Sequence, residues 1–239
     1  MIKFIYFSVI ILTISFLSCA TTPPVKKMQS ELSKYPEYSI ILNDIKEEGT
    51  FFPDYYHRYK IVYGEKVGDS DSLAYHTGIT DWQKVDENVY NDNENFLGMV
   101  IVAKSLDKGE SNTPQPAGYQ YVGNSRYGQW RQDSRGGSFW EFYGKYAFFS
   151  HVFGGLTRPV YRSGYDNYRR YQSGGRPYYG RNNQYGTRGK YTQQTNKSFF
   201  ERRKAREAAR KSRFSNRVNS KSRRSGMSGY RSRSGGSGK

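Results

Sequence analysis

The chain has 239 residues and carries 38 Lys or Arg against 21 Asp or Glu, which gives a formal net charge of +17. Its only cysteine is Cys19, so an intrachain disulfide is excluded.

The first 18 residues have the pattern of an export signal. Lys3 supplies a positive start, and residues 4–17 form an apolar run of about 14 residues, whereas a helix needs roughly 20 to cross a bilayer. The run ends at Ser18, directly before Cys19. The sequence therefore predicts a signal peptide over 1–18.

The segment Phe16-Leu17-Ser18-Cys19 resembles the lipobox of bacterial lipoproteins. In that motif an apolar, a variable and a small residue precede the cysteine. The resemblance implies lipid on Cys19 and anchoring at the cell membrane or the outer membrane, facing the periplasm or the cell exterior. Two or more acyl chains make such anchoring stable. Residues 19–29 are then expected to be the lipidated cysteine and a polar tether. An uncleaved N-terminal anchor is the alternative.

Residues 30–155 hold all three Trp and nearly all the aliphatic residues of the mature chain, which predicts one small domain. A helix is expected from Pro36 to Gly49, because apolar side chains recur there at i, i+3, i+4 and i+7. These side chains are Tyr38, Ile41, Leu42 and Ile45. Strands are expected at 55–67, 82–90, 97–103 and 119–122.

A second helix is expected from Ser138 to Phe153. Ser138 and Glu141 have the spacing of a capping box, and aromatic side chains then follow in steps of three and four residues. The predicted fold class is α+β: a small antiparallel or mixed sheet with two packed helices, followed by a long disordered basic tail with one short helix.

The composition changes near Gly155. Residues 158–239 hold 23 Lys or Arg and 3 acidic residues, which leaves 15 basic and 18 acidic residues for the rest of the chain. A segment so poor in aliphatic residues is expected to be disordered. The sequence predicts an Arg/Gly/Tyr-rich disordered linker over 156–197, a basic helix over 198–214 and a Ser/Arg/Gly-rich disordered tail over 215–239.

No pattern of an active site stands out. His57, His76 and His151 lie far apart without metal-ligand spacing, and the acidic run 91–94 lacks the register of a calcium loop. The sequence therefore predicts a non-enzymatic protein with no catalytic residues, no metal and no cofactor. An envelope hydrolase whose nucleophile and base are distant in sequence is an open alternative.

The basic tail contains the best candidates for binding. Arg offers bidentate contacts to phosphate or carboxylate, and Tyr offers a flat stacking surface. An anionic partner is expected to contact Arg162, Tyr165, Tyr168, Arg169, Arg170, Tyr171, Arg202, Arg203, Lys204 and Arg206.

The predicted function is that of a membrane-anchored cell-envelope lipoprotein whose tail binds an anionic lipid, a glycan or a partner protein. The alternative is a membrane-tethered nucleic-acid-binding protein, because the tail is similar to RGG- and RS-type segments. Export out of the cytoplasm disfavours nucleic acid as the partner.

Overall fold

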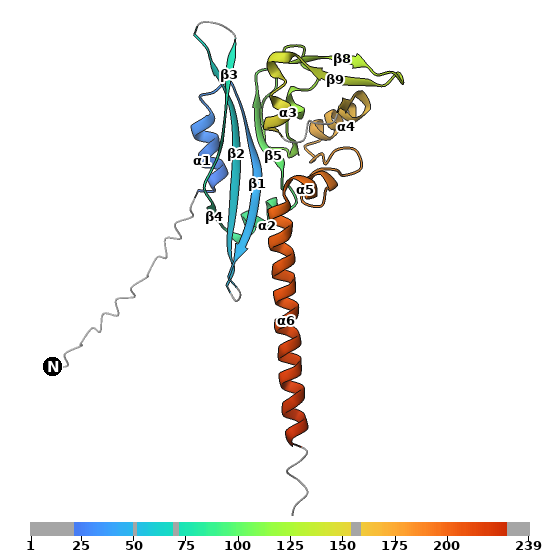
Figure 1. Cartoon of the computed structure of the whole chain (residues 1–239). Helices are drawn as coiled ribbons and strands as arrows, with labels where there is room; N and C mark the ends of the chain where they lie inside the picture. Colours follow the sequence, from blue (N-terminus) through green and yellow to red (C-terminus); the bar gives the residue numbers. More distant parts are fainter. Residues whose placement is uncertain (1–21, 50–51, 69–71, 154–158, 229–239) are drawn as a thin grey trace, which may run out of the picture.

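The structure is a computed structural model of the protein, and it describes residues 22–49, 52–68, 72–153 and 159–228 (Figure 1). The predicted signal peptide and Cys19 lie outside the described residues. The described part is an α+β fold, which confirms the predicted class.

Two antiparallel sheets organise the fold. The strands are β1 (Glu37–Glu48), β2 (Asp54–Lys66), β3 (Leu73–Ile79), β4 (Gln83–Val85), β5 (Met99–Ser105), β6 (Gly109–Ser111), β7 (Gln115–Pro116), β8 (Gly128–Gln132), β9 (Ser138–Phe142) and β10 (Val160–Tyr161). The larger sheet has the order β3-β2-β1-β5-β6, with β4 beside β2 and β7 beside β5. The smaller sheet has the order β10-β9-β8.

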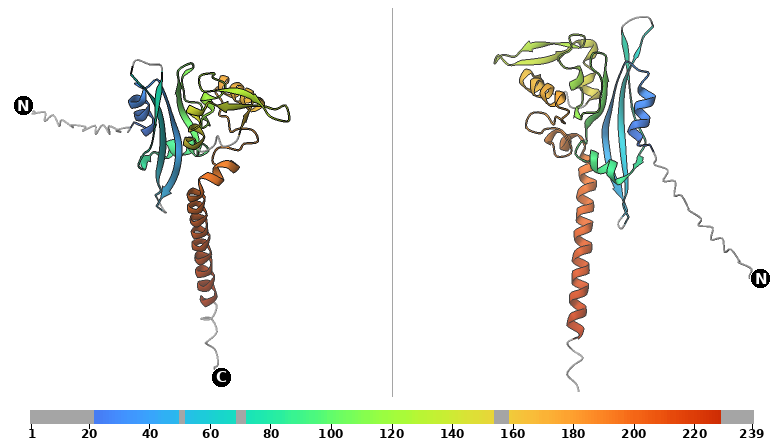
Figure 2. Two further views of the ribbon diagram at one scale, coloured as in Figure 1. Left: turned by 45° about the horizontal axis from the view of Figure 1, so that its top comes forward. Right: turned by 180° about the vertical axis from the view of Figure 1, so that it is seen from behind.

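Helices lie on both sides of the larger sheet (Figures 1 and 2). They are α1 (Pro24–Leu32), α2 (Glu87–Asn93), α3 (Phe149–Val152), α4 (Arg162–Ser173), α5 (Lys190–Thr195) and α6 (Lys197–Ser228), with the 3-10 turns η1 (Tyr119–Tyr121) and η2 (Gly144–Tyr146). α1 covers one face of the sheet, and the smaller sheet with α3 and α4 lies on the other side.

The segment predicted as the first helix is instead the central strand β1, which pairs with β2 and β5. Side chains from Glu37 to Leu42 are buried on both faces of the sheet. A run that is apolar on both faces fits helical spacing as well as a two-faced strand, and cross-strand pairing decides between them. Gly49, expected to end a helix, instead follows β1 with φ +90°.

Of the four predicted strands, two are confirmed, one is partly wrong and one is wrong. β2 and β5 confirm the strands at 55–67 and 97–103, and β5 is buried on both faces as expected. The strand predicted at 82–90 is wrong in its second half, where β4 gives way to α2. The strand predicted at 119–122 is wrong, because Gly118 has φ +87° and leads into the 3-10 turn η1.

The helix predicted over 138–153 is also wrong. Its first residues form β9, which pairs with β8 so that Trp140 lies opposite Trp130. Only η2 and the single turn of α3 follow. Phe142 and Phe149 still pack together, with ring centroids 5.8 Å apart, but they come from β9 and α3. Aromatic spacing thus predicted the burial correctly and the secondary structure incorrectly.

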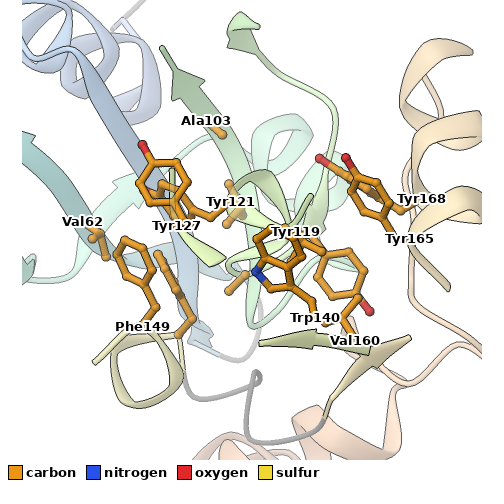
Figure 3. Close-up of a cluster of buried hydrophobic side chains, with 14 of the residues drawn as sticks. Val62, Ala103, Tyr119, Tyr121, Tyr127, Trp140, Phe149, Val160, Tyr165 and Tyr168 are labelled. Carbon is orange, nitrogen blue, oxygen red and sulfur yellow. The ribbon is translucent and has the colours of Figure 1, made fainter. Parts of the chain in front are cut away.

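Hydrophobic side chains fill both sides of the larger sheet. On one side α1 buries Met28 and Leu32, so the tether predicted over 19–29 is wrong from Pro24 onward. On the other side the core is dominated by aromatic rings, which reach from η1 and α3 to α4 (Figure 3). Pro24 occupies the first helical position, where its missing N–H costs nothing.

The linker predicted to be disordered over 156–197 is folded from Val160 onward. α4 buries Tyr165 and Tyr168 in the aromatic core, and the ring centroid of Tyr168 lies 5.4 Å from that of Tyr119 (Figure 3). Each buried aromatic ring removes roughly 150–250 Å² from water. This burial offsets the backbone entropy on which the prediction of disorder rested. The domain therefore extends well past its expected end at residue 155.

The basic helix predicted over 198–214 is confirmed as the first half of α6. The disordered tail predicted over 215–239 is wrong as far as Ser228, and residues 229–239 lie outside the described part. Ala, Arg and Lys, which are strong helix formers, are frequent in the first half of α6, whereas its second half is richer in Ser and Asn. α6 projects away from the domain in every view (Figures 1 and 2).

Candidate anion-binding arm

Helix α6 is basic along its whole length. It contains twelve Lys or Arg and two acidic residues, Glu201 and Glu207. At 1.5 Å per residue, its 32 residues span about 48 Å. Its first turns pack on the domain, and we call them the root. The rest of the helix, from Ala208 onward, is the arm.

Two acidic residues of β1 hold the root. Nη2 of Arg202 donates to both carboxylate oxygens of Asp44, at 2.7 and 2.8 Å. Nη2 of Arg206 donates to Glu47, and Nη2 of Arg210 lies 3.6 Å from the same carboxylate. Because charge-assisted bonds are directional, these contacts fix the axis along which the arm leaves the domain.

A β-bulge explains how β1 presents this surface. The pairing of β1 with β2 shifts register between Leu42 and Asp44, and a bulge of this kind re-aims the side chains beside it. The carbonyl oxygen of Asn43 accepts a hydrogen bond of 2.8 Å from Nδ2 of Asn196, just before α6. Phe199 completes the root, because its ring is buried against the sheet.

The ring of Trp82, beside the root, forms cation–π contacts with three basic side chains. Nζ of Lys46 lies 4.6 Å from the centroid of its ring, and the guanidinium carbons of Arg202 and Arg58 lie 5.8 and 5.9 Å away. The negative face of an indole ring attracts such cations. The root therefore combines ion pairs, a buried aromatic side chain and cation–π contacts.

A groove of about 390 Å³ runs beside the root. Its walls mix cations such as Arg188 and Arg203 with Glu94 and Glu207, and Arg203 pairs with Glu207 at 3.2 Å. Charges of both signs already meet each other here. The groove is therefore a poor site for an anion, in contrast to the arm.

Cations continue along one face of the arm. Arg210, Arg213, Arg217 and Lys221 follow in steps of three, four and four residues, which at about 100° per residue places them in one row. We call this row the basic stripe. No acidic residue follows Glu207 in α6. Within the described part of the chain, neither Arg217 nor Lys221 has an acidic partner.

The two faces of the arm differ in chemistry. Phe214 and Val218 border the basic stripe and are 70% and 47% exposed. The opposite face carries small polar side chains, namely Ser212, Ser215, Asn216 and Asn219. Helices with cations beside exposed apolar residues on one face, and polar residues on the other, are typical of membrane surfaces.

The structure divides the predicted binding residues into two groups. Tyr165 and Tyr168 are buried, so they offer no stacking surface to a partner. Tyr171 is partly exposed, and the guanidinium of Arg162 lies 4.8 Å from the ring of Trp130. These side chains of the 159–197 segment therefore serve mainly the fold.

The predicted cations have different surroundings. Arg202 and Arg206 hold the root, and Arg203 pairs with Glu207. Exposed positions are occupied by Lys204, Arg169 and Arg170. Sequence reasoning missed the basic stripe beyond residue 210, although its three-four-four spacing was a readable signal.

The three histidines have different surroundings. His57 is fully buried, its Nδ1 lies 2.9 Å from the hydroxyl oxygen of Tyr59, and burial lowers its pKa to about 4. His76 lies 3.4 Å from the exposed carboxylate of Glu65 and stacks on Tyr63. His151 is exposed at the end of α3.

Residues 22–49, 52–68, 72–153 and 159–228 hold no group of three His, Cys, Asp or Glu side chains placed to bind a metal ion. None of the helices in these ranges combines the length and the apolar composition needed to cross a membrane.

Comparison with known proteins gives no relative: no protein-family model, no curated protein and no solved structure matches the chain.

Proposed function

We propose that this protein is a non-enzymatic cell-envelope lipoprotein whose arm binds the anionic headgroup surface of a membrane. The observation that carries the proposal is the basic stripe, bordered by Phe214 and Val218 and followed by no acidic residue. Lipid on Cys19, expected from the lipobox resemblance, would keep the arm close to such a surface.

The chemistry of the arm supports lipid over nucleic acid. Each Lys or Arg near an anionic membrane contributes about 1 kcal/mol, and Phe214 and Val218 have the size to enter the boundary between headgroups and acyl chains. A nucleic acid would use the cations but would leave the two apolar side chains in water. Arg206 at the root and Arg210, the first cation of the basic stripe, lie on the same face of the helix and already contact the carboxylate of Glu47.

Vesicle binding of the Cys19→Ser protein, which carries no lipid, isolates the contribution of the arm. The triple variant Arg213→Ser, Arg217→Ser, Lys221→Ser should bind vesicles that contain anionic lipid about 100-fold more weakly, since it loses three cations worth about 1 kcal/mol each. Binding of the unsubstituted arm should fall steeply as salt is added.

A matched control removes the same charge from the folded part of the tail. The variant Arg170→Ser, Arg176→Ser, Arg181→Ser changes three exposed cations and should bind vesicles within about threefold of the parent. Equal losses in both triple variants would mean that net charge, and not the arm, drives binding. Tighter binding to an oligonucleotide than to anionic vesicles would favour the nucleic-acid alternative.

The lipid anchor has its own test. Mass spectrometry of the mature protein should find an acylated N-terminal Cys19, and Cys19→Ser should move the protein out of the detergent-soluble membrane fraction. A mature chain that begins at Met1 would contradict the lipoprotein part of the proposal.

A further inference from the structure

A small cavity of about 210 Å³ lies between the edge of the larger sheet and α4, far along the chain from the arm. Its floor consists of small side chains on β5 and β6, where Ser111 lies opposite Ala103. Ser105 and Gly109 form the next pair. Side chains of this size leave the sheet face unfilled, so α4 closes over a space instead of a packed core.

The inner wall of the cavity is polar and almost fully buried. Gln115 and Gln120 are 2% and 4% exposed, and Tyr168 donates a hydrogen bond to Oε1 of Gln115. Nε2 of Gln120 donates to the hydroxyl of Ser39, but Oε1 of Gln120 has no hydrogen-bond partner in the described part of the chain. Buried polar atoms are normally paired, so an unpaired amide oxygen at a cavity points to a missing donor.

Two cations line the mouth of the cavity, with the exposed Asp107 beside one of them. Lys108, in the turn between β5 and β6, and Arg169, on α4, both line it and are exposed. Neither cation forms an ion pair with any residue that the structure describes. Gln172 and Ser173 add further polar groups from α4. One end of the cavity thus offers amides and a hydroxyl, and the other end offers two cations.

We propose that this cavity binds a sugar acid, with its carboxylate at Lys108 and Arg169 and its hydroxyl groups against Gln115, Gln120 and Tyr168. A hydroxyl can donate to the unpaired oxygen of Gln120, which a simple carboxylate cannot do. A neutral sugar would leave the two cations unused. The volume corresponds to about seven waters of liquid, so it suits a single sugar ring and not a polymer.

The proposal goes beyond membrane binding, because the cavity and the basic stripe share no residue. It is tested on the whole chain by isothermal titration with sodium glucuronate, glucose and sodium acetate. Glucuronate should bind at least about tenfold more tightly than glucose, since one charge-assisted contact is worth about that factor. Acetate should bind no better than glucose.

Substitutions at exposed side chains test the proposal without disturbing the fold. Arg169→Gln and Lys108→Gln should each weaken glucuronate binding about tenfold, and Arg170→Gln, the neighbouring exposed cation on α4, should leave it unchanged. Gln120→Leu removes the unpaired oxygen and should weaken glucuronate and glucose alike. Absence of heat with glucuronate at millimolar concentration, or glucuronate binding that survives both Arg169→Gln and Lys108→Gln, would overturn the proposal.

Discussion

The segment from Val160 to Asn196 and the arm each carry seven Lys or Arg, but the first is folded onto the domain and the arm projects from it. The first carries Tyr among its Arg residues, and three of these rings, from Tyr165, Tyr168 and Tyr178, are buried in the aromatic core. The arm has Ser and Asn where the first segment has Tyr, and every side chain described from Glu207 onward is exposed. Burial of aromatic rings therefore lets a basic segment fold onto the domain.

The largest effect is expected from a substitution in α4, within the folded segment. Tyr168→Ala removes a buried ring and its hydrogen bond to Gln115, which should lower the free energy of unfolding by about 3–5 kcal/mol. Tyr171→Ala, on the exposed side of the same helix, should cost less than about 1 kcal/mol. Urea unfolding measures both. Equal, small effects would mean that α4 is not part of the cooperative fold.

Acid should weaken the domain through His57. Burial lowers its pKa to about 4, so between pH 6.5 and pH 4 the unfolded chain binds a proton that the folded chain does not. Stability from this group is complete above about pH 6.5 and is lost as the pH falls, by about 2 kcal/mol between pH 6.5 and pH 5. His57→Gln should lose that part of the pH dependence in urea unfolding, and His151→Gln should keep it.

The root, where the two regions meet, should give a smaller effect. Asp44→Ala leaves Arg202 without its carboxylate, and because Arg202 is partly exposed the cost should be about 1–2 kcal/mol. Glu48→Ala, which removes an exposed partner of Lys46, should stay within about 0.5 kcal/mol. If Asp44→Ala leaves the urea midpoint where it was, the root does not hold α6 on the domain.

The smallest effect is expected in the arm. Phe214→Ala removes an exposed ring, so the free energy of unfolding should change by less than about 0.5 kcal/mol. The same variant should bind anionic vesicles roughly tenfold more weakly, because the ring no longer enters the lipid boundary. A lower free energy of unfolding with unchanged vesicle binding would mean that Phe214 serves the fold and not membrane binding.

The sequence predicted β2, β5 and the start of the basic helix, because each of these has one dominant local signal. The α+β class was also predicted, although both helices expected within the domain were wrong. β1 was missed because Ile40, Ile41 and Leu42 are apolar on both faces, and only pairing with β2 and β5 chooses the strand. α4 was missed because average composition hid the helical spacing of Tyr165 and Tyr168, which form its buried face.

The root was beyond local reasoning for a different reason. Asp44 and Arg202 are separated by 158 positions in the sequence. Their contact depends on a β-bulge in β1, which no local sequence pattern predicts. The basic stripe, in contrast, could have been found by extending the helix past residue 214 and following the cations along one face. From the sequence we therefore expected basic side chains on this helix, but not the contacts of the root or the basic stripe beyond residue 210.

Hydrogen–deuterium exchange of the whole chain tests the central comparison most directly. Backbone amides of α4 should exchange as slowly as those of β1, because both belong to the cooperative core, and amides of α6 beyond Arg210 should exchange orders of magnitude faster. Fast exchange in α4, at the rate of the arm, would contradict the account, and so would an arm protected to the same degree as β1.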